Sequence, residues 1–244
     1  MTVMVSTLAR CLRGSVVATL GCVLVTATAL IGCSRTIDGT VRAAPTDAGS
    51  KEPIPLADLL IEPARFPARY PAVVLDPPAV DRVFREIDGA AAGSVVTPPE
   101  CAPPPVAAEA AAVAGIDSQN ARSLIVAVSR TGAPLRGRID QLAGCPGFTS
   151  VAGPDRSSVR MNTLPMPPVD ADESYAMDQT VTSPTSGSMT RTLTLVAQIA
   201  DVRVSATWLQ DGTPDTTPYA TPETEPLDTL FTDAVLKVRR DGQP

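Results

Sequence analysis

The sequence contains no histidine: none of its 244 residues carries an imidazole side chain. This absence excludes Ser-His-Asp and Cys-His catalysis, and it excludes metal sites built from imidazole ligands. Carboxylates alone can catalyse hydrolysis, and Asp58 with Glu62 is a pair of the right kind. Such acids are common on the surface of an acidic protein, so we expect a protein that is not an enzyme and needs no cofactor. A carboxylate-only envelope hydrolase is kept as an alternative.

Aromatic residues and positive charge are also scarce, which limits the partners that the chain can bind. It has four Phe, three Tyr and one Trp, and its net charge is −6 at pH 7. Few rings leave few platforms for stacking on bases, and a negative chain is repelled by phosphate groups, so we expect no nucleic-acid partner. Asp170, Asp172 and Glu173 form a short acidic run. The glycine and the distal glutamate of a calcium-binding loop are missing there, so we expect no metal site.

An uncharged run covers residues 14–33 and follows Arg10 and Arg13. A basic start followed by an apolar run is typical of a secretory signal. The run ends in Leu30-Ile31-Gly32-Cys33, which resembles the lipobox of bacterial lipoproteins. The resemblance implies that residues 1–32 are a signal peptide and that Cys33 receives a diacylglycerol group. The mature chain would then be anchored through its lipid to the outer, extracytoplasmic face of the cell membrane, where two or more acyl chains hold a protein stably.

An uncleaved signal anchor is the alternative, because the same stretch is close to the roughly 20 residues that cross a bilayer as a helix. Both interpretations place the C-terminal part outside the cytoplasm, since Arg10 and Arg13 hold the N-terminus inside. Residues 33–55 contain three prolines and show no apolar periodicity. We expect them to be a flexible spacer between the membrane and the domain that follows.

The cysteines fall into separate groups if the signal peptide is removed. Cys11 and Cys22 leave with it, and Cys33 carries the lipid, so Cys101 and Cys145 remain. Disulfides persist outside the cytoplasm, and pairing these two would close a loop of about 44 residues and stabilise the fold by roughly 4 kcal/mol. The alternative is a pair of free thiols, although neither has a basic neighbour that would lower its pKa.

Hydrophobic periodicity and turn residues predict an α+β domain over residues 56–241. We expect one helix that Asp76 caps and that ends near Gly89, a second over residues 135–143, a third after Thr224, and a short one within the alanine-rich residues 105–114. We expect strands near residues 72–75, 123–129, 157–164 and 175–182, a hairpin over 190–210 that turns at Ala200-Asp201, and an exposed loop over 211–226. This order favours a single domain with an antiparallel sheet, helices packed on one face and one disulfide.

Three short segments resemble a group of small mycobacterial lipoproteins of unknown function. They are Arg35-Thr36-Ile37-Asp38-Gly39-Thr40, Thr97-Pro98-Pro99-Glu100-Cys101-Ala102-Pro103 and Gly144-Cys145-Pro146-Gly147-Phe148. The outer domains of this group are similar to the extracytoplasmic sensor domain of the receptor kinase PknH. The resemblance implies a ligand-binding or signal-sensing module, and a likeness of fold by itself says little about function.

Four residues are candidate ligand contacts. Arg65 and Arg69, beside Tyr70, can hold an anion through bidentate hydrogen bonds. Trp208, near the end of the last expected strand, can line a cleft. The alternatives are surface salt bridges for the two arginines and a core position for the tryptophan.

The leading hypothesis is therefore a membrane-anchored binding or sensing module whose ligand lies between the sheet and the flanking helices. Its partners would be the membrane, through the lipid, and an envelope ligand or protein that the sequence does not identify. One alternative is a carrier of cell-envelope lipids or glycolipids, which needs a continuous apolar cavity of several hundred cubic ångströms. The other is the hydrolase named above, which needs two carboxylates about 5–10 Å apart in one pocket.

The lipid anchor can be tested at its attachment residue. We expect Cys33→Ala to abolish maturation and to move the chain from the membrane fraction to the soluble or precursor fraction, because the thiol is the acylated group. Detergent phase partitioning and mass spectrometry of the N-terminal peptide measure both effects. Unchanged partitioning of the variant would contradict the anchor.

Overall fold

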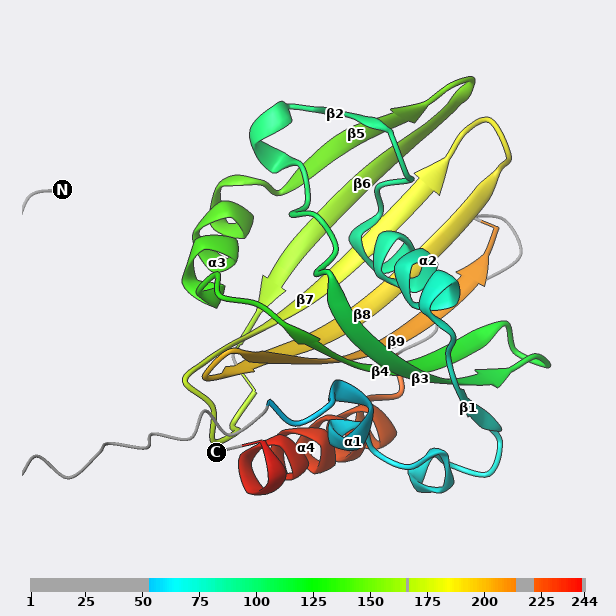
Figure 1. Cartoon of the computed structure of the whole chain (residues 1–244). Helices are drawn as coiled ribbons and strands as arrows, with labels where there is room; N and C mark the ends of the chain where they lie inside the picture. The colour runs from blue at the N-terminus through cyan, green and yellow to red at the C-terminus, as the bar shows by residue number, and fades with distance from the viewer. Residues whose placement is uncertain (1–52, 166, 214–221, 243–244) are drawn as a thin grey trace, which may run out of the picture. The chain divides into compact units, whose positions relative to one another are not determined.

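A nine-stranded antiparallel sheet forms the centre of the computed structural model, which describes residues 53–165, 167–213 and 222–242 (Figure 1). The strands lie in the order β1-β3-β4-β9-β8-β7-β6-β5-β2. They are β1 Ala72–Val74, β2 Val95–Thr97, β3 Glu109–Asp117, β4 Arg122–Arg130, β5 Gly147–Ala152, β6 Asp155–Leu164, β7 Glu173–Ser183, β8 Ser188–Ile199 and β9 Val202–Gly212. The predicted α+β class, the antiparallel sheet and the Cys101–Cys145 disulfide are confirmed.

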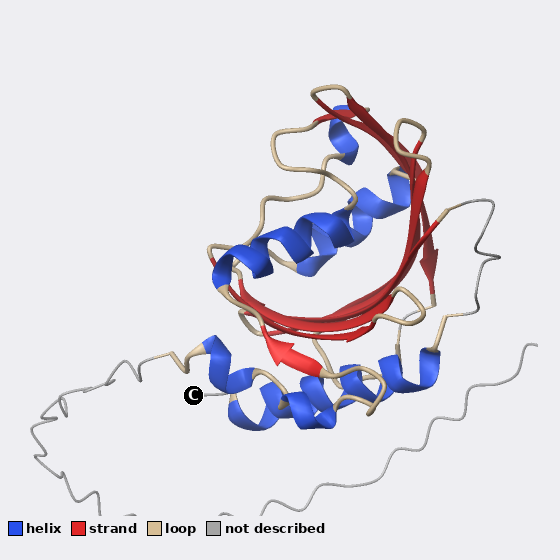
Figure 2. Ribbon diagram, turned by 90° about the vertical axis from the view of Figure 1, so that its right-hand side faces the viewer, coloured by secondary structure: helices blue, strands red, loops and turns tan. Residues whose placement is uncertain are grey.

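Helices cover both faces of this sheet, whereas the sequence predicted them on one face only. The helices are α1 Leu56–Leu59, α2 Pro77–Asp88, α3 Leu135–Gly144 and α4 Thr224–Asp241, with 3-10 turns η1 Pro63–Arg65 and η2 Pro99–Cys101. The sheet curves around α2 and α3, and α1 and α4 lie outside the curve, so we name the two sides the concave and convex faces (Figure 2). The reason is two-sided burial: in β4, Leu124 packs on the convex side and Ile125 on the concave side. A strand that is apolar on both sides needs a covering layer on each.

The convex face holds the largest apolar core. The β8–β9 hairpin turns at Ala200 and Asp201 as predicted, with Ala200 at a φ of 51°. Alternate residues of both strands face α4, and Trp208 among them is fully buried. The apolar stripe of α4 consists of Leu227, Leu230, Phe231, Ala234, Val235 and Val238. Each large side chain buried here contributes about 1.5–3 kcal/mol, so this layer is a main source of stability.

Helix α2 forms where the sequence predicts it. The carboxylate of Asp76 accepts a hydrogen bond from the backbone N–H of Ala79 at 2.8 Å, which caps the first turn. Gly89 follows the last turn with a φ of 70°, a conformation that favours glycine. The apolar side of the helix, which includes Val80 and Ile87, packs on the concave face. Asp88, the last residue of the helix, lies on this concave side of the sheet as well.

The prediction of a helix within residues 105–114 is wrong, because residues 109–114 belong to β3. Alanine favours helices in an isolated peptide. In the folded chain, Ala112 and Ala114 face α2 and pack against Val80 and Ile87, a contact for which small side chains are suited. Packing therefore overrides local propensity here. Strand β5, which pairs with β6 and with the short edge strand β2, is absent from the predicted strands.

Several predictions from the sequence lie outside the described residues. These are the signal peptide, the lipobox, most of the spacer, and residues 214–221 of the expected loop. Within the described parts of the chain, no helix combines the length and the apolar character that crossing a membrane requires. The anchor at Cys33 therefore stays a prediction.

The close approach of the N-terminal segment to β3 at Gly115 can be tested by substitution. A Cβ added there would lie 2.8 Å from Cδ1 of Phe66 and 2.8 Å from the backbone oxygen of Tyr70. We expect Gly115→Ala to lower the free energy of unfolding by about 1–3 kcal/mol through overpacking, as measured by urea denaturation. Gly132→Ala is the matched control, since its Cβ would meet no atom within 4 Å. Equal stabilities of the two variants would contradict the packing described here.

Candidate functional site

A cavity of about 240 Å³ lies between the concave face of the sheet and the helices α2 and α3, and residues 104–107 form part of its wall. The lining combines apolar and polar side chains. Phe84, Ile87 and Val196 are among the apolar ones, and Asp88, Arg138, Tyr175 and Arg203 are among the polar ones. We name this cavity the concave pocket. Space between a sheet and its flanking helices is a usual location for small-molecule sites.

Four polar side chains from four different elements meet in the concave pocket. Asp88 is the last residue of α2, Arg138 lies on α3, Tyr175 on β7 and Arg203 on β9. Oδ1 of Asp88 is 3.9 Å from Nη2 of Arg138, and the exposed fractions of these side chains are 26% and 7%. This distance is longer than a hydrogen bond, so the two groups attract each other through charge alone.

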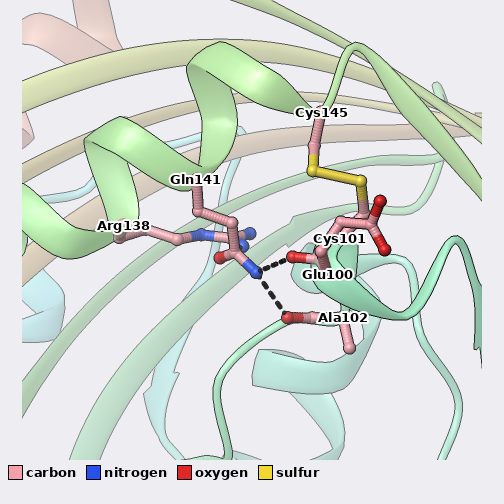
Figure 3. The surroundings of a disulfide bond; sticks show 6 residues. All are labelled: Glu100, Cys101, Ala102, Arg138, Gln141 and Cys145. Carbon is pink, nitrogen blue, oxygen red and sulfur yellow. Dashed lines mark hydrogen bonds between the residues drawn. A yellow bond between two sulfur atoms is a disulfide. The ribbon is translucent and has the colours of Figure 1, made fainter.

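The position of Arg138 depends on contacts of α3 with the segment around η2. Nη1 of Arg138 donates a hydrogen bond to Oε1 of Gln141 at 2.6 Å. Nε2 of Gln141 donates to the carbonyl oxygens of Glu100 and Ala102 at 2.7 and 2.8 Å. The disulfide joins the same two segments, with its Cα atoms 5.6 Å apart (Figure 3). One covalent bond and two hydrogen bonds thus hold α3 against the chain that continues into the pocket wall.

The guanidinium of Arg203 is held by uncharged acceptors. Nη2 donates to the carbonyl oxygen of Ala133 at 3.0 Å and to Oε1 of Gln198 at 3.1 Å. Its Nε is buried and has no hydrogen-bond partner among the described residues. The carbonyl and the amide fix the orientation of the guanidinium, and no carboxylate in the described parts of the chain bonds to it directly.

The pocket changes the acid–base behaviour of its charged groups. Burial raises the pKa of Asp88 to about 6, although the charges of Arg138 and Arg203 act in the opposite direction. Burial also raises the pKa of the Tyr175 hydroxyl, so this group stays protonated at neutral pH. The pKa of Arg203 is lowered, first by burial and then by the positive charge of Arg138. Asp88 therefore gains or loses its charge near pH 6, while arginine side chains remain charged at that pH.

A wider and more open hollow of about 640 Å³ lies on the other side of α2, lined by Asp81, Glu86 and Asp211 among others. Burial and the charge of Asp211 raise the pKa of Glu86. Asp81 pairs with Arg85 on the same helix at 2.9 Å, and Asp211 accepts a hydrogen bond from the hydroxyl of Thr190 at 2.7 Å. Several acids thus share one hollow, and the carboxylate-only hydrolase stays a prediction.

Three of the ligand contacts predicted from the sequence are bonded to acidic side chains of this protein. These acids lie in α4 or directly before it. Nη2 of Arg65 lies 2.5 Å from Oδ2 of Asp233. Arg69 pairs with Glu223, and the hydroxyl of Tyr70 donates to the same carboxylate at 3.1 Å. Burial and the charge of Glu223 raise the pKa of Tyr70 to about 12. The structure brings these residues together as links between the N-terminal segment and α4, outside the lining of the concave pocket.

The remaining candidates also take part in internal contacts. Trp208 is fully buried in the convex core and does not line the concave pocket. Asp170 and Asp172 both pair with Arg239, at 3.4 and 3.1 Å, and Glu62 pairs with a lysine of α4. Within the described ranges, no group of three or more metal-ligating side chains is found.

Sequence reasoning did not identify the polar residues of the concave pocket. Asp88, Arg138, Tyr175 and Arg203 are spread over more than a hundred residues of the chain, and none belongs to a recognisable motif. One local signal was present. Arg203 alternates with the apolar residues of β9 that face the convex core, so its side chain lies on the concave face. A charged residue on a strand that is buried on both faces is uncommon and indicates a polar cavity.

Comparisons with known proteins give little further information. No protein-family model matches the chain, and no curated protein is similar to it. An uncharacterised protein from Mycobacterium smegmatis, described as an Rv0999 ortholog, has a structure that aligns with a TM-score of 0.43 at 16% identity. The alignment covers 72% of this chain and 92% of that one. This neighbour is itself an uncharacterised mycobacterial protein.

The raised pKa of Asp88 makes a prediction for stability. The fold raises this pKa from 3.8 to about 6, so the ionised carboxylate destabilises the fold above about pH 6 and ceases to do so below about pH 4. The shift corresponds to about 3 kcal/mol at most. Wild type should therefore lose stability between pH 4.5 and pH 7.5, whereas Asp88→Asn should not. Measured by urea denaturation, the free energy of unfolding of the variant minus that of wild type should rise by about 1–3 kcal/mol over this range.

The exposed Asp155 provides the control for this measurement, as Asp155→Asn makes the same chemical change on the surface. A difference between Asp88→Asn and wild type that is the same at both pH values would show that the carboxyl group of Asp88 titrates normally.

Proposed function

We propose that the protein is a lipid-anchored module on the outer face of the cell membrane that binds or senses a small molecule without catalysing a reaction. The observation that carries the binding part is the concave pocket, in which Asp88, Arg138, Tyr175 and Arg203 meet between the sheet and the helices. Removing such groups from water costs several kcal/mol unless they are well paired. Their incomplete pairing is typical of a site that a ligand completes, and titratable groups with shifted pKa values gather at functional sites.

The size and the lining of the pocket favour a small polar compound. Its volume of about 240 Å³ is just below the roughly 300–1,000 Å³ of most small-molecule sites. A carrier of envelope lipids or glycolipids needs a continuous apolar cavity, and guanidinium groups in the wall are unfavourable for acyl chains. A hydrolase that works with two carboxylates needs two acids in one pocket. Asp88 is the single carboxylate among the described residues of this lining, so such a hydrolase would have to use the acids of the hollow beside α2 instead.

Two features support the cellular location in this proposal. The uncharged run that ends in Leu30-Ile31-Gly32-Cys33 supports export and acylation. The disulfide between Cys101 and Cys145 is typical of a chain that folds outside the cytoplasm. A ligand for such a module would come from the cell envelope or from the medium.

Filling the pocket tests the binding function. Ser205 of β9 lines the concave pocket, so Ser205→Phe would place a ring inside it. The full chain, purified from membranes in a neutral detergent, is screened by thermal shift against a library of small metabolites. We expect at least one compound to raise the melting temperature of wild type by several degrees, as a ligand at a hundred times its Kd adds about 2.7 kcal/mol. Ser205→Phe should abolish the shift.

Ser118→Phe is the matched control, because Ser118 is exposed in the turn between β3 and β4. This variant should respond to the same compounds as wild type. A compound that stabilises Ser205→Phe as strongly as wild type would place the binding site elsewhere. A wild-type chain that no compound of the library stabilises would contradict a binding module.

A further inference from the structure

We propose that the ligand of the concave pocket is a small organic carboxylate with an apolar body, and that Asp88 competes with this ligand for Arg138 and Arg203. The inference rests on the binding function proposed above, and it adds the chemical class of the ligand and its control by pH. In this arrangement the two guanidinium groups hold the ligand's carboxylate, and the apolar side chains of the lining contact its body.

The two arginines of the pocket are paired differently from most arginines that the structure describes. Arg65, Arg122 and Arg191 each have a carboxylate oxygen at 2.5, 2.6 and 2.7 Å. Arg138 and Arg203 instead donate to amide and carbonyl oxygens. These neutral acceptors hold the guanidinium groups in place without neutralising them. Two oriented positive charges thus border a cavity with one carboxylate, and an anion that accepts their hydrogen bonds would be strongly favoured there.

The apolar part of the lining limits what the anion can be. Phe84 and Ile87 of α2, Val196 of β8 and Val106 of the adjoining segment border the same cavity as the arginines. A strongly hydrated inorganic anion would leave these side chains without contacts. A compound with a carboxylate at one end and an apolar body fills the charged and the apolar parts together. The volume of about 240 Å³ restricts this body to a few carbon atoms or a single ring.

Asp88 is placed to compete with such an anion. The charged and titratable groups around it are Arg138 on α3, Arg203 on β9, Tyr175 and Glu173 on β7, and Arg85 on its own helix. Arg85 is paired with Asp81, and Glu173 accepts a hydrogen bond from the backbone N–H of Arg136. The charge of Glu173 also acts on Arg203, but Glu173 does not line the pocket. Asp88 is the carboxylate that lines the pocket and acts on both arginines, at 3.9 Å from Arg138.

This competition makes ligand affinity depend on pH. When Asp88 is ionised it offsets part of the arginine charge, and when it is protonated the full charge acts on the ligand. Burial places this change near pH 6. Because binding and protonation are linked reciprocally, a bound carboxylate raises the pKa of Asp88 further, and affinity rises as the pH falls from 7.5 to 5.5.

The experiment is a calorimetric titration of the full chain in neutral detergent and low chloride. The probes are benzoate and benzamide, which have nearly the same shape and differ in charge. We expect benzoate to bind at least tenfold more tightly than benzamide, because a carboxylate is the better acceptor for arginine. We expect its affinity for wild type to rise roughly tenfold between pH 7.5 and pH 5.5. Ser205→Phe should abolish the binding.

The variants separate the roles of the charged residues. Asp88→Asn should bind benzoate at pH 7.5 as tightly as wild type binds it at pH 5.5, and its affinity should no longer depend on pH. Arg203→Met should weaken binding at least tenfold, whereas Arg156→Met, at an exposed position, should leave it unchanged. Asp88→Asn is expected to bind more tightly than wild type at pH 7.5, and a misfolded protein would not do so. This variant therefore tests the proposal even if Arg203→Met fails to fold.

Failure of this inference can be distinguished from failure of the binding function. Equal affinities for benzoate and benzamide, or an Asp88→Asn variant that keeps the pH dependence of wild type, would overturn the carboxylate and its competition with Asp88. If neither probe binds but a neutral compound from the metabolite screen does, the inference fails and the binding function stands. If no compound binds at all, both fail.

Discussion

The fold depends on the apolar contact between α4 and the convex face of the central strands. Leu124 of β4, Trp208 of β9 and Phe231 of α4 are almost completely removed from solvent in this layer. Because one face of these strands is closed by apolar packing, the other face can carry polar groups such as Arg203 and Ser205 without loss of the fold. Burying a guanidinium costs several kcal/mol, and the convex core offsets that cost. Stability and binding chemistry are thus divided between the two faces of the same strands.

The elements that could be predicted from the sequence are those with local signals. Asp76 and Gly89 mark the ends of α2, and the alternation over residues 193–208 marks the β8–β9 hairpin. The strand β3 could not be predicted in this way, because Ala112 and Ala114 are strand residues owing to their packing under α2, which the local sequence does not record. The helices on both faces did have a local signal, because Leu124 and Ile125 form part of one continuous apolar run, which is typical of a strand buried on both sides.

The candidate site was beyond prediction for a related reason. Asp88, Arg138, Tyr175 and Arg203 come together through the curvature of the sheet and the placement of α2 and α3. Apart from Arg203, none of them stands out in its local sequence. The disulfide was predictable from cysteine number and compartment. Its proximity to Arg138, through Gln141 and the segment around η2, becomes visible only in the structure.

The nine-stranded sheet ends on both sides in a strand of three residues, β1 and β2. An open sheet edge is a template on which another chain can add a strand, and short edges limit this. Val73, Val74 and Val95 are exposed on these two strands, so edge length and not edge polarity provides the protection. The consequence concerns amyloid-like growth: each outermost strand offers a neighbouring molecule only a few free backbone groups on which to extend the sheet.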